Sequence, residues 1–379
     1  MLKPSFKIAY LSSENPKNKK VWSGTHYSIY KELCKIGDVE ILGPFQPKFQ
    51  IWLSKILNQL SLIFTGKRIS YRQSIYISKG YAAYFNEQLN AKTYDLIVAP
   101  AASCEIAFIE TKTPILYITD GTFASCLNYH KSLSRLRQKS IEEGNQIEKL
   151  ALQKAKFVIV SSEWAKKSVL EDYGSIEDKV HVLPFGANLE TIPTQLEIKF
   201  DIPDKWKILF VAVYWEDKGG DRAYACFKEL KDKGYPVEFS VLGCKVPEKY
   251  NDPDIKIIPF IDKNSKGGQE KMAEIFKTHH FLILPTRFDC TPIVINEASA
   301  FGLPSFIART GGIEGHLKDG VNGFTISYTD TGSEYAENIE QFINHPEKYV
   351  QLRTKSRKLY EEELNWDHWR KQIEKIISS

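Results

Sequence analysis

The sequence contains no apolar run long enough to cross a membrane and no cysteine pattern typical of a metal or disulfide site. No uninterrupted apolar stretch in its 379 residues approaches the roughly 20 that span a bilayer. The six cysteines are scattered, without the paired spacings of zinc or redox motifs. The first residues lead directly into an apolar segment at 6–11, which leaves no room for a signal peptide. We therefore expect a protein of the reducing cytoplasm.

Other motifs are also missing. The first expected strand is followed by residues 12–16, SSENP, where a nicotinamide or flavin enzyme would carry G-x-G-x-x-G. The net charge is only +4, too small to indicate a nucleic-acid partner. The histidines show no ligand spacing, and we expect no Asp-x-Asp motif to support a divalent cation. The sequence therefore predicts no metal site.

Short apolar runs alternate with longer amphipathic ones, a pattern typical of parallel sheets covered by helices. A chain of this length exceeds one core and predicts about two domains. The pattern predicts two successive Rossmann-like sets, joined near 184–193, where Pro and Gly interrupt it. We assign residues 1–188 and 189–360 to the two domains and 361–379 to a terminal helix. Expected strands are 6–11, 39–42, 95–99, 115–119, 157–161, 180–183, 207–213, 237–242, 255–258, 281–285, 304–308 and 323–326.

Residues 285–304 predict a strand end that leads into a helix suited to binding an anion. Thr291 is a good N-cap and Pro292 suits the first helical position, while Gly302 followed by Pro304 favours a stop. The backbone N–H groups of the next two residues, Ile293 and Val294, then have no helical acceptor. Such amides, at the positive end of the helix dipole, favour a phosphate.

Two carboxylates flank this predicted phosphate site. Asp289 precedes the helix and Glu297 follows eight positions later, so both can bind hydroxyls around the phosphate. A phosphate surrounded by hydroxyls indicates a sugar nucleotide. The ordered set resembles family 4 glycosyltransferases, also called glycosyl transferases group 1, and consists of Asp289, Glu297, Ala298, Ala300, Gly302, Pro304, Gly311 and Gly312.

The resemblance implies an α/β protein of the GT-B fold, with two Rossmann-like domains facing across a cleft and a C-terminal helix crossing back to the first. The segment Glu361–Trp369 continues to Ile373, Ile376 and Ile377 and suits that helix. Trp366 and Trp369 are three apart on one face, which predicts packing anchors.

The start of the second domain resembles the family's phosphate-binding strand, loop and helix. Lys218 and Gly219 match its Lys-Gly, and the ammonium of Lys218 is suited to neutralising a diphosphate. Many relatives carry an Arg shortly after the strand, where this chain has Ala212, Val213 and Tyr214. Arg287 is a candidate substitute.

In the first domain, Gly24 matches the family's glycine-rich loop, although the usual double glycine is Ser23-Gly24 here. Asp120 ends a predicted strand at the position where many relatives have a His that contacts the donor sugar. An Asp there can accept a sugar hydroxyl or lie near the acceptor nucleophile. The alternative is a turn aspartate that caps the residues after it.

Between Glu40 and Glu87 the sequence has no acidic residue, whereas several basic and apolar residues fall inside. Such a segment can lie on an anionic membrane or bind an anionic lipid-linked acceptor. The alternative is ordinary core beside a solvated basic face. The candidate acceptor or membrane residues are Trp52, Lys55, Lys67, Arg68 and Arg72, extended by Lys131, Arg135, Arg137 and Lys139.

The resemblance implies a retaining, metal-independent glycosyltransferase without a cofactor, with a UDP-sugar favoured over a GDP-sugar. Candidate catalytic residues are Asp120, Lys218 and Asp289. Candidate donor-binding residues are Gly24, Lys218, Gly219, Arg287, Asp289, Thr291, Ile293, Val294 and Glu297.

The expected acceptor is a glycan or a lipid-linked glycan in surface polysaccharide or glycolipid assembly, at the inner face of the membrane. The rival hypotheses are a catalytically degenerate GT-B carbohydrate-binding protein and a sugar-nucleotide epimerase.

Overall fold

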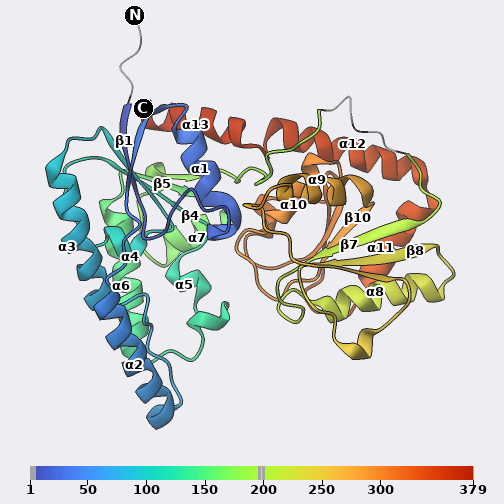
Figure 1. The fold of residues 1–379 in the computed structure, drawn as a ribbon, viewed down its shortest axis with the longest axis horizontal. Helices are drawn as coiled ribbons and strands as arrows, with labels where there is room; N and C mark the ends of the chain where they lie inside the picture. Colours follow the sequence, from blue (N-terminus) through green and yellow to red (C-terminus); the bar gives the residue numbers. More distant parts are fainter. Residues whose placement is uncertain (1–5, 195–197, 199–200, 379) are drawn as a thin grey trace, which may run out of the picture. The chain divides into compact units, whose positions relative to one another are not determined.

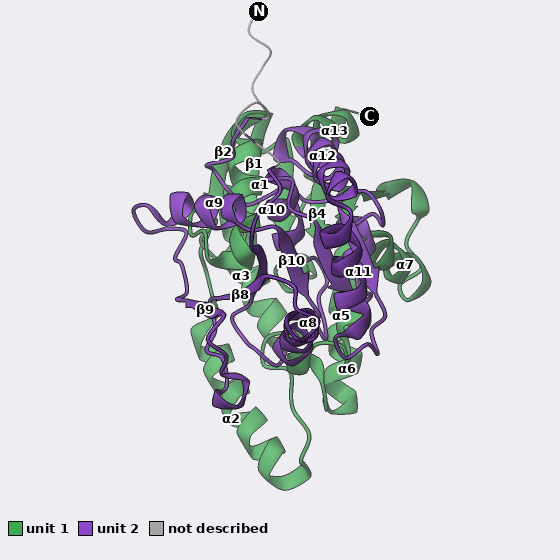
Figure 2. Ribbon diagram, turned by 90° about the vertical axis from the view of Figure 1, so that its right-hand side faces the viewer, with its two compact units in different colours: residues 1–183, 370–379 green, residues 184–369 purple. Residues whose placement is uncertain are grey.

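The computed structural model describes residues 6–194, 198 and 201–378 and divides into two compact units. The first unit consists of residues 1–183 with 370–379, and the second of residues 184–369 (Figure 2). Each unit contains one parallel six-stranded sheet covered by helices (Figure 1). All twelve predicted strands are found in their predicted order, each bounded within two residues of the expected ends.

The first unit has the strand order β2-β1-β3-β4-β5-β6. Its strands are β1 (Phe6–Leu11), β2 (Gly37–Leu42), β3 (Leu96–Pro100), β4 (Ile115–Thr119), β5 (Phe157–Val160) and β6 (Val180–Val182). Its helices are α1 (Thr25–Leu33), α2 (Lys48–Thr65), α3 (Ile75–Ala91), α4 (Ser103–Ile106), α5 (Phe123–Cys126), α6 (Gln138–Lys154) and α7 (Glu163–Glu171), with 3₁₀ turns η1 (Val21–Gly24), η2 (Lys131–Leu133) and η3 (Glu177–Lys179).

The second unit has the strand order β12-β11-β10-β7-β8-β9. Its strands are β7 (Trp206–Val211), β8 (Val237–Leu242), β9 (Ile255–Ile258), β10 (Phe281–Leu284), β11 (Ser305–Ala308) and β12 (Gly323–Ile326). Its helices are α8 (Gly220–Asp232), α9 (Gly268–Thr278), α10 (Val294–Ala300), α11 (Ser333–Asn344) and α12 (Pro346–Glu362), with 3₁₀ turns η5 (Glu248–Tyr250) and η6 (Ile313–Gly315).

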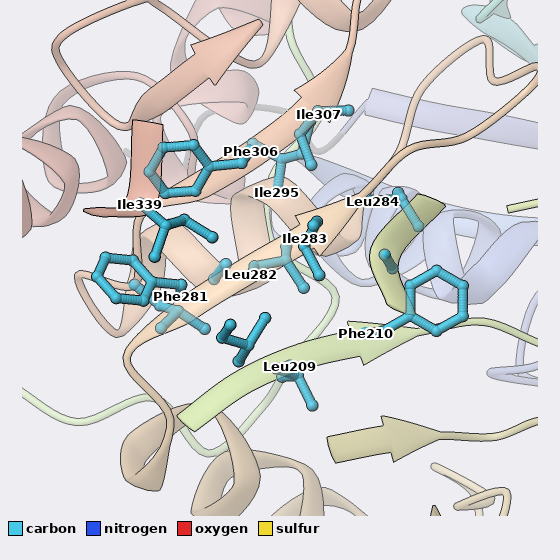
Figure 3. Packing of buried hydrophobic residues seen from close by; sticks show 14 of the residues in the cluster. Leu209, Phe210, Phe281, Leu282, Ile283, Leu284, Ile295, Phe306, Ile307 and Ile339 are labelled. Atoms are coloured by element: carbon cyan, nitrogen blue, oxygen red, sulfur yellow. The ribbon is translucent and has the colours of Figure 1, made fainter. Parts of the chain in front are cut away.

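Strand β10 is central to the core of the second unit. All four of its residues are buried, as expected for a parallel strand covered on both faces. Its side chains pack between those of β7 and β11, and Ile295 of α10 joins the same cluster (Figure 3). The core therefore fixes α10 against the sheet.

Two buried arginines of α12 hold the other end of α10. The Arg353 guanidinium donates to the carbonyls of Gly302, at 2.9 Å, and Phe301, at 3.1 Å. The Arg357 guanidinium donates to the carbonyl of Ala300. These cations satisfy the last carbonyls of the helix and complement the negative end of its dipole.

The last helix, α13 (Trp366–Ser378), belongs to both units. Trp366 stacks on Phe185 with ring centroids 5.9 Å apart, within the second unit. Arg370 belongs to the first unit, where its Nε lies 3.4 Å from the carboxylate of Glu32 in α1. The prediction that the C-terminal helix returns to the first domain is confirmed.

Candidate active site

The sheet of the second unit reverses its strand order between β7 and β10. The chain proceeds from β7 to β8 and β9 on one side, and later from β10 to β11 and β12 on the other. The loops after β7 and β10 therefore diverge at the carboxyl edge of the sheet, where open α/β sheets bind their ligands. The β7–α8 loop carries Lys218 and Gly219, and the β10–α10 loop carries Arg287 and Asp289.

Lys218 and Asp289 form an ion pair across this reversal point. Their side chains are 27% and 15% exposed, so the pair is accessible at the surface of the second unit. The Lys218 ammonium also lies 5.6 Å from the centroid of the Phe288 ring. The structure thus brings together two predicted residues that are 71 positions apart in the sequence. An anionic ligand here would share the ammonium with Asp289.

Gly219 is required by the geometry of the β7–α8 loop. Its φ is +75°, and a Cβ at this position would lie 2.0 Å from the carbonyl oxygen of Pro285. The backbone of the two loops therefore approaches too closely for any side chain. This contact fixes the loop that carries Lys218 against the end of β10.

The start of α10 differs from the prediction. The helix begins at Val294, and its N-cap is Ile293, without a side-chain cap, so the prediction that Thr291 caps the helix is wrong. A tight turn precedes it, because the Ile295 amide donates to the Pro292 carbonyl at 3.0 Å. Among the described residues, the amides of Ile293 and Val294 have no hydrogen-bond acceptor, as predicted from the sequence.

Glu297 lies deeper than Asp289 and has its own cation. Its side chain is 4% exposed and pairs with Lys263, which follows β9. The Lys263 ammonium also lies 3.4 Å from the carbonyl oxygen of Asn188. Sequence reasoning missed Lys263, because it stands in a polar loop whose spacing carries no motif.

Arg287 is engaged within the second unit. Its guanidinium donates to both carboxylate oxygens of Asp221, in the first turn of α8, at 3.0 and 2.7 Å. It also donates to the carbonyl of Glu216. Arg287 therefore joins the β10–α10 loop to the loop that carries Lys218, and a role in phosphate binding would require it to share these partners.

In the first unit, Asp120 contacts Trp22, which stands two positions before Gly24 and was not among the predicted site residues. The indole N–H of Trp22 donates to the Asp120 carboxylate at 3.0 Å. Trp22 and Ser23 have φ values of 48° and 56°, and Gly24 follows with φ of 97°. Three consecutive left-handed residues are costly outside glycine, and strain of this kind collects at functional sites.

Nearby, His26 is buried in α1, and its Nδ1 lies 2.8 Å from the hydroxyl of Tyr10. Burial lowers the pKa of His26 to about 4. The imidazole is therefore neutral at physiological pH, and its contact with Tyr10 is the arrangement of a structural histidine.

A cavity of about 950 Å³ lies within the first unit, at the carboxyl end of β3 and beside α2. Its lining includes three predicted cations, Lys55, Arg68 and Arg72, whereas Trp52 and Lys67 are not part of it. Glu14 and Glu105 also line it, and burial raises the pKa of Glu105. Glu105 has no motif around it and was missed from the sequence.

An acidic Asp-x-Asp pair does occur, at Asp252 and Asp254, contrary to the expectation from the sequence. Both carboxylates are already paired, because the Lys231 ammonium lies 2.6 Å from one and 2.7 Å from the other. A hydrogen bond from Lys205 is the main cause that lowers the pKa of Asp254 to about 2. Among the described residues, no group of three or more His, Cys, Asp or Glu is placed to hold a metal ion.

Comparison with known proteins agrees with this geometry. Residues 193–359 match the family described as "Glycosyl transferases group 1". The capsular polysaccharide biosynthesis glycosyltransferase CapM of Staphylococcus aureus is 26% identical over 211 residues, which cover 52% of this chain and 55% of CapM. The chain spans about half the length of the curated relatives it matches.

Two solved structures share the fold over almost the whole chain. Sucrose-phosphate synthase from Thermosynechococcus elongatus has a TM-score of 0.71 at 15% identity, covering 98% of both chains. Anabaena HepE in complex with UDP has a TM-score of 0.64 at 16% identity, covering 98% of this chain and 99% of HepE.

The two parallel sheets and the reversal-point site of the second unit define a GT-B fold. The match to the glycosyl transferases group 1 family, the family 4 glycosyltransferases, lies within the second unit. The resemblance carried by Asp289, Glu297 and the glycines that follow them is thereby confirmed.

Proposed function

We propose that this protein is a retaining, metal-independent glycosyltransferase that moves a sugar from a nucleotide diphosphate sugar to a glycan or lipid-linked acceptor. The observation that carries the proposal is the Lys218–Asp289 pair at the reversal point of the second sheet, with Glu297 and Lys263 behind it. This is where an α/β sheet binds its ligand, and it offers both a cation for phosphate and carboxylates for hydroxyls.

Within this proposal each donor group has a chemically matched partner. Lys218 and the amides of Ile293 and Val294 bind the diphosphate. Glu297 accepts hydrogen bonds from the ribose, and Asp289 from the sugar. Gly219 lets the Lys218 loop approach, while Arg287 positions that loop through Asp221.

The nucleotide base in this proposal is uracil. The support is that HepE, which shares this fold, was solved with UDP. The family resemblance assigns Gly24 and Asp120 of the first unit to the donor as well, and the Trp22 indole orients the Asp120 carboxylate within that unit.

The chemistry is a substitution at the anomeric carbon with retention. The bond from that carbon to the phosphate oxygen breaks as the acceptor oxygen attacks from the same face, and the acceptor's proton passes to the departing phosphate oxygen. The protein's part is to stabilise the negative charge that develops on the diphosphate, which Lys218 and the two amides are suited to do. No step requires a metal ion.

The place of the reaction is surface polysaccharide or glycolipid assembly. Similarity to CapM, whose name assigns it to capsular polysaccharide biosynthesis, supports this assignment. None of the described helices is both long and apolar enough to cross a membrane.

The proposal is tested by nucleotide diphosphate release from UDP-, GDP- and ADP-sugars in the presence of EDTA. We expect release from one donor, and its loss in Lys218→Ala but not in the control Lys277→Ala, an exposed lysine of the same unit. Release from no donor, together with no thermal stabilisation by any nucleotide, would indicate the degenerate binding protein. Sugar isomerisation without an acceptor would indicate the epimerase.

A further inference from the structure

Helix α2 is oriented with its polar residues inward and its apolar residues outward. The buried side chains are Ser54, Asn58 and Ser61. They lie three or four positions apart, which places them on one face of the helix. The opposite face is apolar and exposed, with exposed fractions of 64% for Phe49, 58% for Trp52, 38% for Ile56, 46% for Leu57, 44% for Leu60, 74% for Ile63 and 80% for Phe64.

Hydrogen bonds of the inward face fix this orientation. The Asn58 side-chain oxygen accepts from the Ile69 amide at 2.9 Å. The Ser61 hydroxyl donates to the Lys67 carbonyl at 2.8 Å. Rotating the helix to bury its apolar face would break these bonds and expose their partners. The exposed stripe is therefore a fixed surface of the first unit. Helix α2 meets α3 at its first turn, where Gln50 lies next to Gly80, and then extends beyond the end of α3 (Figure 1).

Exposed aromatic and aliphatic side chains in a continuous stripe of this length mark a docking surface. The sequence left open that these apolar residues belong to an ordinary core. Helix α2 is different, because the side chains that it turns toward the core are polar.

Three cations stand beside the same helix without carboxylate partners. Lys55, Arg68 and Arg72 line the cavity of the first unit, and none has an ion pair within the described part of the chain. The second basic run lies next to them, since the Arg68 amide donates to the Arg135 carbonyl at 2.8 Å. The Arg68 guanidinium also donates to the Lys131 carbonyl at 2.9 Å. The cavity lining carries four cations, Lys20, Lys55, Arg68 and Arg72, against the two carboxylates Glu14 and Glu105, and this excess of positive charge favours an anion.

Building on the transferase function proposed above, we propose that α2 lies in the interface of an anionic membrane and that the cavity binds the phosphate of a lipid-linked acceptor. One element supplies both features, because the apolar stripe and Lys55 belong to the same helix. A helix with one apolar face and basic residues beside it lies in the plane of the headgroups. The cavity would then open where a lipid phosphate is found.

The charge pattern favours a membrane over a second copy of this chain. A two-fold symmetric dimer places each patch against itself. Here that would bring Lys48, Lys55 and Lys67 of one copy near those of the other, in a segment without any acidic residue between Glu40 and Glu87. Anionic lipid headgroups offer the opposite charge.

The membrane contact is tested by sedimentation with vesicles of phosphatidylcholine alone and of phosphatidylcholine mixed with phosphatidylglycerol. We expect binding to the mixed vesicles, reduced roughly tenfold for each large side chain removed in Trp52→Ser and Phe64→Ser. The matched control is Ile176→Ser, which removes a residue of the same unit that is 70% exposed. Equal binding of all variants, or concentration-dependent dimerisation that these substitutions abolish, would overturn the membrane assignment.

The phosphate site is tested by thermal stabilisation with decyl phosphate, decanol and inorganic phosphate. We expect decyl phosphate to stabilise the protein more than either other probe, and Lys55→Ala and Arg72→Ala to lose this effect. Lys112→Ala, an exposed lysine of the same unit, is the control. Equal effects of decyl phosphate and inorganic phosphate would indicate a free anion as the ligand and overturn a lipid-linked one.

UDP binding separates a failure of the membrane and phosphate sites from a failure of the transferase function. Stabilisation by UDP reports on the second unit, and we expect it to be unchanged in the variants of α2 and of the cavity. A protein that binds UDP but neither vesicles nor decyl phosphate would remain a glycosyltransferase, with a soluble acceptor.

Discussion

The charged residues at the candidate donor site form two ion pairs. Lys218 stands with Asp289, and Lys263 with Glu297, which is almost fully buried. A buried carboxylate is costly without a cation beside it, so Lys263 makes the position of Glu297 possible. The ammonium of Lys218 is less buried and can be shared with an incoming phosphate.

The two carboxylates are expected to affect different parts of the donor. If Glu297 binds the ribose, Glu297→Gln should weaken UDP and UDP-sugar to a similar extent, by about ten- to hundredfold for a lost charged hydrogen bond. If Asp289 binds the sugar, Asp289→Asn should weaken UDP-sugar but leave UDP unchanged. Calorimetric titration with both ligands measures this.

The control is Glu314→Gln, because the Glu314 side chain lies in the same unit and is 74% exposed. Equal losses for UDP and UDP-sugar in Asp289→Asn would contradict the assignment of Asp289 to the sugar.

The sequence predicted the site residues that lie within motifs. It missed the site residues that come from distant segments of the chain. Asp289 and Glu297 are eight positions apart, and their spacing was informative. Lys263 reaches Glu297 from 34 positions away, and Trp22 reaches Asp120 from 98. Such contacts depend on the sheet order, which a local pattern does not contain.

At the scale of elements, helix α8 is bracketed by two glycines with left-handed backbones. Gly219 precedes it with φ of +75°, and Gly234 follows it with φ of +86°. A Cβ on Gly219 would meet Pro285, whereas a Cβ on Gly234 would meet nothing within 4 Å. An alanine at Gly234 would therefore add backbone strain alone, whereas an alanine at Gly219 would add both backbone strain and a steric clash.

We expect Gly234→Ala to cost about 1 kcal/mol of stability, the strain of a left-handed alanine. Gly219→Ala should cost more, because the loop must also move away from Pro285, and it should weaken nucleotide binding by displacing Lys218. Urea denaturation and UDP titration of both variants measure the two effects. Equal losses of stability in the two variants would mean that the loop can move away from Pro285 at no cost.

Helix α6 carries a buried carboxyl group, Glu148, which accepts a hydrogen bond from the Tyr117 hydroxyl at 2.8 Å. Burial raises the pKa of Glu148 from its ordinary 4.5 to about 7. Between these values the unfolded chain releases the proton while the folded protein keeps it. The free energy of unfolding therefore falls as the pH rises from about 4.5 to about 7, by roughly 3 kcal/mol.

We expect Glu148→Gln to remove this decline, as measured by urea denaturation across that pH range. Burial lowers the pKa of His26 to about 4, so this group contributes with the opposite sign, and stability is lost as the pH falls. We therefore compare the free energy of unfolding of the variant with that of the wild type at each pH. The contribution of His26 is the same in both proteins and cancels in this difference. Glu142→Gln, at an exposed position of the same helix, should leave the pH profile unchanged.

The elements were predicted unequally well, for physical reasons. Continuous apolar runs identify parallel strands because these are buried on both faces, and all twelve were found. The start of α10 was misplaced, because Thr291 and Pro292 precede a tight turn before the helix begins. For α2 the sequence indicated an amphipathic segment, but only the packing of Ser54 and Asn58 shows which face is outside.

At the scale of the whole molecule, the chain forms two units and its end returns to the first. Alternation of strands and helices predicted two Rossmann-like sets, because each sheet needs its own core. The return of α13 was implied by family resemblance and is visible in its contacts. Trp366 donates to the Asn188 side chain at 3.0 Å in the second unit, while Ile373 is fully buried in the first.

The last turns of α13 should therefore stabilise the first unit, although they follow the second in the sequence. We expect Ile373→Ala to lower the stability of the first unit by about 2–5 kcal/mol, as for other buried aliphatic truncations. Hydrogen exchange should show lost protection in β1 and α1, with β7 and β10 unchanged. Lys375→Ala, at an exposed position of the same helix, should leave both patterns intact. Loss of protection in the second unit instead would mean that α13 acts there, and that its contact between Arg370 and Glu32 contributes little.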